Sequence, residues 1–112
     1  MFGAHVQGSA NITTSATATL FAAGGSGTRW SLQKGLLSVY IGTGNALIDL
    51  METDSTGSDS ATFFTISGSV PVVLPVDFGE HGFSAASTNS RLALQVTGSE
   101  AGVFCMFVGY ER

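Results

Sequence analysis

Apolar side chains alternate with polar or small ones along most of this chain, and a period of two is typical of half-buried β-strands. The first alternating segment is 10–22, where the even positions other than Thr14 are apolar and the odd ones are largely Thr and Ser. A GGSG turn at 24–27 ends it, and TRWSLQ begins the next segment with Trp30 and Leu32 on one face. The pattern predicts two strands joined by a glycine-rich turn, with Trp30 in the core.

The alternation changes phase after Gly35, so that Leu37, Val39 and Ile41 now carry the core face. A glycine at such a shift predicts a β-bulge. The next segment, 46–53, alternates again with apolar residues at its even positions, except at its polar end. We therefore expect a strand on each side of a short connection.

Further strands are expected at 61–67, 70–79, 91–98 and 102–110. Pro71 and Pro75 donate no backbone hydrogen bonds, which predicts that 70–79 is an edge strand or a strand end. The last segment, 102–110, is apolar on both faces. Such a strand either lies centrally in a sandwich or faces a neighbouring subunit.

No segment shows the sustained period of 3.6 that marks an amphipathic helix. The expected fold class is therefore all-β: a single antiparallel β-sandwich of seven to eight strands with a jelly-roll-like topology. A chain of 112 residues is enough for one domain. We expect residues 1–8 to form an N-terminal arm and residues 9–112 to form the β-sandwich domain.

Charged residues make up only 11% of the chain, against about 25% in an average globular protein. The uncharged run 13–28 is rich in Thr, Ser, Ala and Gly and would be a poor membrane span. The N-terminal segment lacks the basic and apolar regions of a secretory signal. The net charge is −4, and the four basic residues are scattered, which argues against a nucleic-acid surface. We expect neither a membrane nor a nucleic acid as a partner.

The candidate chemistry is sparse. The only cysteine, Cys105, excludes an intrachain disulfide, and its apolar surroundings in VFCMFVG predict a buried, inert thiol. His81 lies near Asp77 and Glu80 in DFGEHGF, but three or four converging ligands would be needed for a metal. We interpret this group as a polar loop cluster, and a hydrolase built around His81 is the weaker alternative. The sequence thus predicts no enzyme, no cofactor and no metal site.

Two further features bear on ligand binding. Loop 54–60 carries Asp54 and Asp59, whose oxygens could hold calcium. The loop lacks the Asp/Asn alternation and closing Glu of a dedicated site, which favours a solvated turn. The candidates for stacking on sugars are Trp30, Tyr40 and Tyr110, since an exposed aromatic face suits such ligands, although the shared phase with Leu32 favours a core position for Trp30.

The order of these features resembles a known group of proteins. SATATLFAAGGSGTRWSLQKGLLSVYIGTG, PVVLPVDFGEHGFSAASTNSRLALQVTG and VFCMFVGYER together resemble small β-sandwich virion proteins of tailed bacteriophages. The resemblance covers about residues 9–112 and rests on composition and order rather than on a diagnostic motif. It implies a jelly roll that assembles as a trimer and decorates or cements the outside of a capsid. It identifies no functional residue.

We therefore expect a structural virion protein on the capsid surface, bound to the major capsid protein and to itself as a homotrimer. The low charge agrees with this expectation, because charge is depleted in the cores of interfaces. The alternatives are a sugar-binding host-attachment module and a tail or fibre component. The candidate contact residues are Phe2, His5 and Val6 in the arm and Phe78, His81 and Phe83 in the loop after residue 77.

Overall fold

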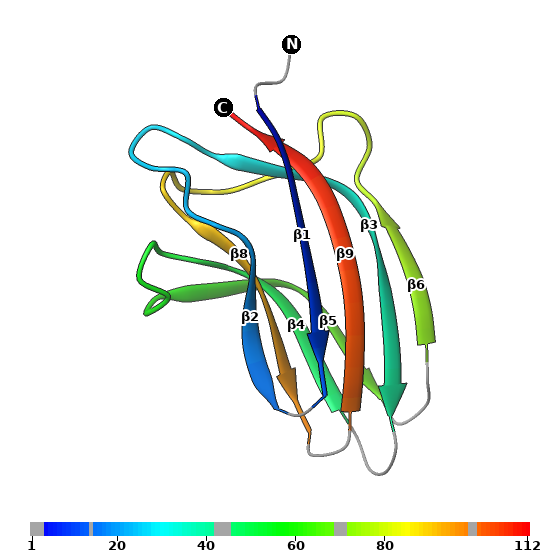
Figure 1. The fold of residues 1–112 in the computed structure, drawn as a ribbon. Coiled ribbons are helices and arrows are strands. Elements are labelled where there is room, and N and C mark those ends of the chain that lie inside the picture. The colour runs from blue at the N-terminus through cyan, green and yellow to red at the C-terminus, as the bar shows by residue number, and fades with distance from the viewer. Residues whose placement is uncertain (1–3, 14, 42–45, 69–71, 99–100) are drawn as a thin grey trace.

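The computed structural model describes residues 4–13, 15–41, 46–68, 72–98 and 101–112. These residues form strands and no helix, which confirms the all-β class (Figure 1). No helix in the described part of the chain is long and apolar enough to cross a membrane. The strands are β1 (Ala4–Ile12), β2 (Ala16–Phe21), β3 (Trp30–Ile41), β4 (Ala46–Thr53), β5 (Ser60–Gly68), β6 (Val72–Asp77), β7 (Phe83–Ser84), β8 (Arg91–Thr97) and β9 (Ala101–Glu111).

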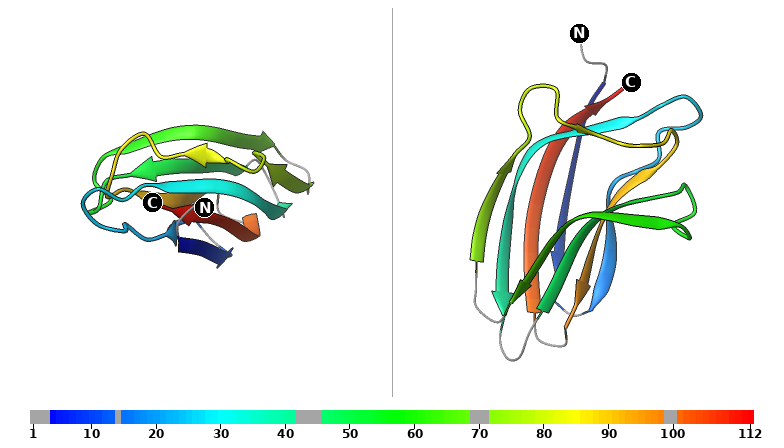
Figure 2. Two further views of the ribbon diagram at one scale, coloured as in Figure 1. Left: turned by 90° about the horizontal axis from the view of Figure 1, so that it is seen from above. Right: turned by 180° about the vertical axis from the view of Figure 1, so that it is seen from behind.

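The strands form two antiparallel sheets that pack face to face (Figure 2). One sheet has the order β1-β9-β3-β6, with the short β7 also paired to β3, and the other has the order β2-β8-β4-β5. The antiparallel pairs β4/β5, β3/β6, β2/β8 and β1/β9 are nested one outside the other. This is the winding of a jelly roll, so the predicted topology is confirmed. The described residues hold nine strands rather than seven or eight.

The predicted strand at 10–22 is in fact two strands in different sheets. The chain leaves β1 at Ile12 and enters β2 at Ala16. Ser15 fixes the crossing, since its Oγ donates to the Gly98 carbonyl at 3.1 Å and accepts from the Gly98 N–H at 3.0 Å. The alternation runs on undisturbed because both strands point their even residues toward the same core.

The predicted boundary between arm and sandwich also needs correction. β1 begins at Ala4 and pairs with β9 along its whole length, from Ala4 opposite Glu111 to Ile12 opposite Val103. Residues 4–8 therefore belong to the sandwich, and residues 1–3 lie outside the described residues. The period of two is weak here because β1 is an edge strand with few large side chains.

The core lies between the two sheets and includes side chains from both. Its largest fully buried apolar members are Leu32, Leu37, Ile48, Leu50, Leu92, Leu94, Val96, Val103, Cys105 and Phe107. Trp30 is buried as predicted and meets Phe21 edge to face, with ring centroids 6.2 Å apart. Its indole N–H has no hydrogen-bond partner among the described residues.

The predicted bulge in β3 is present, but it precedes the glycine. The pairing with β9 shifts between Leu32 and Lys34, so Gln33 is the extra residue. The phase change that follows buries Leu37 as expected. The side chain of Ile41 lies outside the part that the structure describes.

Gly35 is required for a different reason, because its missing side chain leaves space for Phe107 and the backbone of β9. A Cβ at this position would overlap the ring of Phe107 and the Met106 carbonyl. β9 lies between β1 and β3, and its inward side chains include the fully buried Cys105 and Phe107. The predicted central position of this strand is therefore confirmed. β6 is an edge strand of the same sheet, as its Pro75 predicts, whereas Pro71 lies outside the described residues.

We predict that Gly35→Ala destabilises the protein by about 1–3 kcal/mol, because the added methyl group overpacks the β3–β9 contact. Gly102→Ala is the matched control, since its Cβ would meet nothing closer than the Ile12 carbonyl at 3.9 Å. We expect the control to shift stability by less than about 1 kcal/mol. Urea unfolding of both variants measures the difference, and equal stabilities would contradict the close packing of Phe107 on Gly35.

Candidate interaction surface

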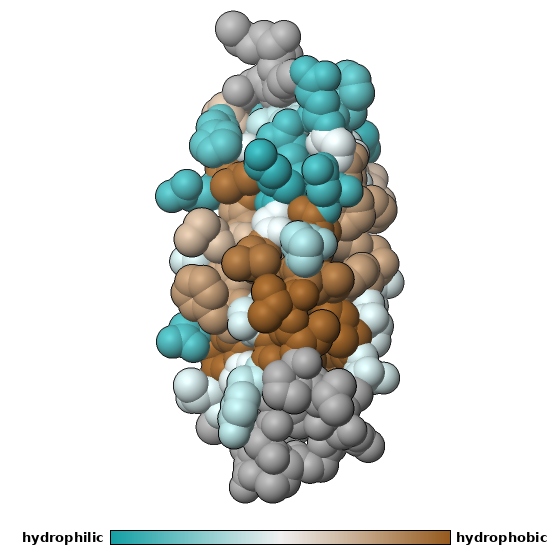
Figure 3. All heavy atoms as spheres, turned by 90° about the vertical axis from the view of Figure 1, so that its right-hand side faces the viewer, coloured by the Kyte–Doolittle hydropathy of each residue, from teal (hydrophilic) through white to brown (hydrophobic). Residues whose placement is uncertain are grey.

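The outer face of the β1-β9-β3-β6 sheet carries an apolar band. Its members are the outward residues of three neighbouring strands: Leu36 in β3, Val73 and Pro75 in β6, and Phe104, Met106 and Val108 in β9. Large parts of several are open to solvent, including 47% of Phe104, 51% of Met106 and 65% of Val73. Figure 3 shows apolar side chains gathered on this side of the molecule.

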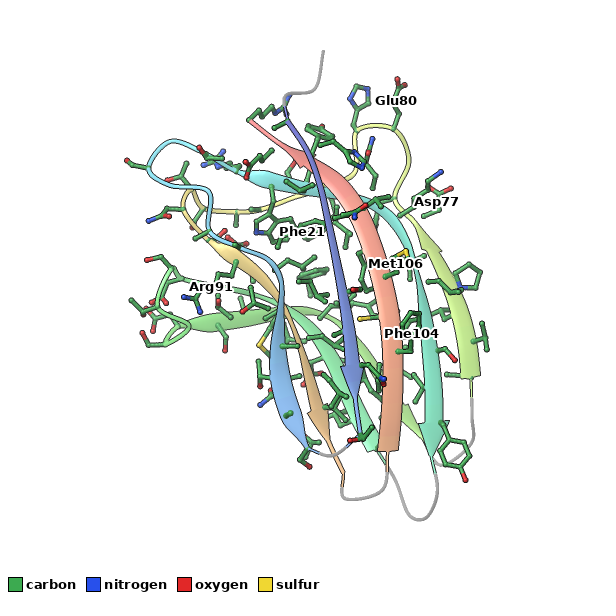
Figure 4. The ribbon with its side chains drawn as sticks, viewed as in Figure 1. Phe21, Asp77, Glu80, Arg91, Phe104 and Met106 are labelled. Carbon is green, nitrogen blue, oxygen red and sulfur yellow. The ribbon has the colours of Figure 1, made fainter. Side chains whose placement is uncertain are left out.

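The strand register builds this band row by row. Leu36 lies opposite Pro75 on one side and Met106 on the other. In the next row, Ser38 lies between Val73 and Phe104. Directly opposite residues in a sheet point to the same face, so these rows form one continuous surface. Figure 4 shows Phe104 and Met106 on β9.

Charged residues close one end of the band. Lys34 lies opposite Asp77 and next to Val108, one row beyond Leu36. Together with all members of the band except Val73, these residues line a shallow hollow of about 390 Å³. On the far side of β9 the rows continue into β1 with the polar residues Gln7, Ser9 and Asn11. The apolar band therefore has polar borders, which is the anatomy of a protein–protein interface.

The loop after β6 does not expose its aromatic residues as a free contact site. Phe83 stacks on Phe63 with ring centroids 4.5 Å apart and an interplanar angle of 17°. Phe78 meets Phe83 at 5.7 Å and packs against the core. Phe63 in turn lies 6.2 Å from Trp30. These side chains close the end of the sandwich, although Phe83 keeps 37% of its surface exposed.

The remaining predicted contact residues are spread over the same end of the molecule. His5 is exposed and lies opposite Tyr110 in the pairing of β1 with β9, whereas Val6 packs against the core. His81 is exposed, and its carbonyl accepts a hydrogen bond from the Tyr110 hydroxyl at 2.9 Å. Phe2 lies outside the described residues. His5, Val6 and His81 do not belong to the apolar band.

The residues that gather near His81 form no metal site. Asp77 accepts a hydrogen bond from the Gly79 N–H at 2.8 Å, and the Glu80 carbonyl accepts one from the Gln33 side chain at 2.6 Å. Figure 4 shows Asp77 at the end of β6 and Glu80 farther along, in the loop that follows. Among the described residues, no three His, Cys, Asp or Glu side chains are placed to hold a metal ion.

Of the aromatic residues considered for sugar stacking, only one is open to solvent. Tyr40 is 65% exposed, whereas Tyr110 and Trp30 are buried. A single exposed ring at the end of β3 offers no stacking platform with a second aromatic wall.

A carboxylate that the sequence did not single out ties the β7–β8 loop to β4. Glu52 accepts hydrogen bonds from the backbone N–H groups of Ala86 and Ser87, at 2.8 and 3.0 Å. The contact spans more than thirty residues along the chain. No local sequence signal could reveal it, because it depends on the fold.

The 54–60 loop is organised by Asp54. The Thr56 hydroxyl and N–H donate to Asp54 Oδ1 at 2.8 and 3.0 Å, and the Ser58 N–H donates to the same oxygen at 3.0 Å. The Ser58 hydroxyl and the Asp59 N–H reach Oδ2, both at 3.3 Å. These bonds, led by that of the Thr56 hydroxyl, lower the pKa of Asp54 from its usual 3.8 to about 2. The carboxylate therefore caps its own turn.

The single thiol is shielded from solvent and from oxidants. Cys105 has no exposed surface. Burial raises its pKa to about 11, although a hydrogen bond from the backbone of Ala10 opposes the rise. The predicted buried thiol is confirmed.

Comparison with known proteins adds a fold relative. No protein-family model matches this chain, and no curated protein matches it. A solved structure described as "Bacillus endospore appendages form a novel family of disulfide-linked pili" is similar to it, with a TM-score of 0.51 and 21% sequence identity. The match covers 96% of this chain and 88% of the other. At this identity the similarity shows a shared fold.

We predict that the Asp54 carboxyl titrates with a midpoint near pH 2 in the folded protein. Because the folded pKa lies below the unfolded one, its contribution to loop stability is complete above about pH 4 and is lost as the pH falls toward 2. NMR of the side-chain carboxyl carbon measures the midpoint. In Asp54→Asn, the Ser58 amide should exchange with solvent faster than in the wild type at pH 5. A midpoint near 4 would contradict the loop geometry.

Proposed function

We propose that this protein is a structural subunit that acts by packing against other protein subunits and performs no catalysis. The observation that carries the proposal is the apolar band on β9, β3 and β6. Six outward apolar residues form one surface with polar borders, on a chain in which only 11% of residues are charged. Such a surface is typical of an interface core rather than of the solvated face of a monomer.

The first partner that we propose is a second copy of this chain. Lys34 and Asp77 flank the band on the same row, so an opposing copy can place a positive group against a negative one. Burial of one half-exposed side chain such as Phe104 or Met106 contributes on the order of 1 kcal/mol. Several such side chains together make a stable contact. The acidic balance of the chain favours a protein partner over nucleic acid.

Within this role we propose a place on the surface of a bacteriophage capsid, as a homotrimer that contacts the major capsid protein. The resemblance in sequence to small virion proteins supports this assignment, and the jelly-roll topology agrees with it.

The second candidate is a subunit of a filamentous surface appendage. The fold similarity to the Bacillus endospore appendage pili supports it. Those pili are described as disulfide-linked, but this chain has no exposed cysteine that could form such a link. The only cysteine is buried between the sheets, so assembly without covalent bonds is the form that we propose.

The sugar-binding alternative receives less support from the structure. Tyr40 is exposed by itself, and the other candidate rings lie in the core. A hydrolase centred on His81 is supported by no convergent set of side chains in the described loop.

We predict that the wild-type protein forms oligomers at micromolar concentration and that Met106→Lys shifts them to monomers, because the ammonium group would be buried unpaired in the contact. Leu47→Lys is the matched control, since Leu47 is 38% exposed and lies on β4 in the other sheet. Light scattering coupled to gel filtration gives the masses against 11.5 kDa for one chain. A monomeric wild type, or a variant that associates unchanged, would contradict the proposal.

Electron microscopy then separates the two candidate assemblies. Purified protein is mixed with phage capsids that lack their surface proteins, and a second sample contains the protein alone. Stoichiometric decoration of the capsids that Met106→Lys abolishes supports the capsid role. Filaments formed by the protein alone support the appendage role and would overturn the capsid assignment.

A further inference from the structure

Two arginines lie side by side at one end of the β3–β9 pair. The Arg29 N–H donates to the Arg112 carbonyl at 2.8 Å, and the Arg112 N–H donates to the Arg29 carbonyl at 3.0 Å. Residues that exchange both hydrogen bonds form a directly opposed cross-strand pair, whose side chains stand on the same face. Half of the four basic residues of an acidic chain therefore meet at one place.

This arrangement is unfavourable without a partner for the charges. Like charges directly opposite each other destabilise a sheet. The Arg112 guanidinium lies 5.7 Å from the centre of the Tyr110 ring, which offers a partial, uncharged contact. Among the described residues, no carboxylate forms an ion pair with Arg29 or Arg112. Glu52 of β4, which faces the β7–β8 loop, is already engaged by two backbone N–H groups.

The two arginines line a hollow that also carries hydroxyl groups. Its volume is about 280 Å³, and its lining residues are Gly27, Arg29, Ser31, Ser84, Thr88 and Arg112. Ser31 is buried, and its Oγ lies 3.0 Å from the Oγ of Ser84. One hydroxyl of this pair donates to the other, and the second proton remains free to donate to a ligand.

The walls of the hollow are held in place by backbone contacts between two loops. The Asn89 N–H donates to the Thr28 carbonyl at 2.9 Å, and the Gly25 N–H donates to Asn89 Oδ1 at 3.1 Å. Asn89 adopts the left-handed conformation, with φ of 54°. Asn tolerates this conformation better than most residues. The pocket therefore exists before any ligand binds.

We propose that this pocket binds the oxyanion group of a small ligand, whether a carboxylate, a sulfate or a phosphate. Two guanidinium groups present planar pairs of N–H donors that match such oxygens, and the serine hydroxyls donate from the side. The bound anion removes the repulsion between Arg29 and Arg112, so binding stabilises the fold. The hollow is large enough for a free ion or for the acid group of a monosaccharide. The acidic balance of the chain disfavours a polyanion.

Thermal unfolding of the full chain tests this site. Sodium sulfate, sodium phosphate and sodium glucuronate are titrated against sodium chloride at equal ionic strength, with glucose as the uncharged control for glucuronate. We expect a saturable rise in Tm with at least one of the three anions and none with glucose. Sulfate and phosphate also stabilise proteins by exclusion from the surface, and that effect does not saturate.

Substitutions of the arginines distinguish anion binding in this pocket from the general stabilisation of proteins by these salts. Arg29→Gln and Arg112→Gln should each weaken the apparent anion affinity at least tenfold, and without anion their Tm should equal or exceed that of the wild type. Arg91→Gln is the control with the same change of charge, because Arg91 lies in β8 beside the 54–60 loop (Figure 4). Its affinity should match that of the wild type. A Tm rise that is identical in all variants, or no saturable rise with any anion, would overturn the proposal.

Discussion

The structure depends on the strict alternation of side chains along β9, because this strand places apolar residues both in the core and on the outer face of its sheet. Cys105 and Phe107 point inward and are fully buried, whereas Phe104 and Met106 point outward and are about half exposed. A period of two allows no other arrangement for a strand that is apolar on both faces. The neighbours adapt to it: β3 has a glycine, Gly35, where the Phe107 ring needs space. The inner face of β9 thus determines the packing of the sandwich, and the outer face determines what the molecule presents to others.

A central position in the sheet explains why the outer apolar residues stay unpaired within one chain. β9 lies between β1 and β3, and no other strand of the described residues covers this face. The loop that could fold over it, 78–90, is held at the end of the sandwich instead, by the stacking of Phe83 on Phe63 and by Glu52. Among the described residues nothing buries the apolar band, which is the physical basis for the structural role that we propose.

Local periodicity was enough to predict the fold class, the core position of Trp30 and the central position of the last strand, because burial on one face leaves a direct mark on the sequence. It could not show the crossing between β1 and β2, since both strands face one core and the phase continues through Ser15. It placed the bulge at Gly35 rather than at Gln33, because a phase change shows only that one residue is extra. The pairing of Arg29 with Arg112 depends on the register of strands far apart in the chain, and no local pattern encodes it.

The register of β3 with β9 places both the apolar band and the arginine pocket on this strand pair, at different positions along its length. Rows opposite Leu36 and Ser38 build the apolar band, and the same strands meet as Arg29 and Arg112 at their other end. Leu36 lies seven positions after Arg29, a distance of roughly 23 Å along an extended strand. The contact proposed on the apolar band and the anion site proposed at the arginines therefore use different residues of the same strand pair. Substitutions at Met106 and at Arg29 can thus test the proposed assembly and the proposed anion binding separately, because each changes a different part of this strand pair.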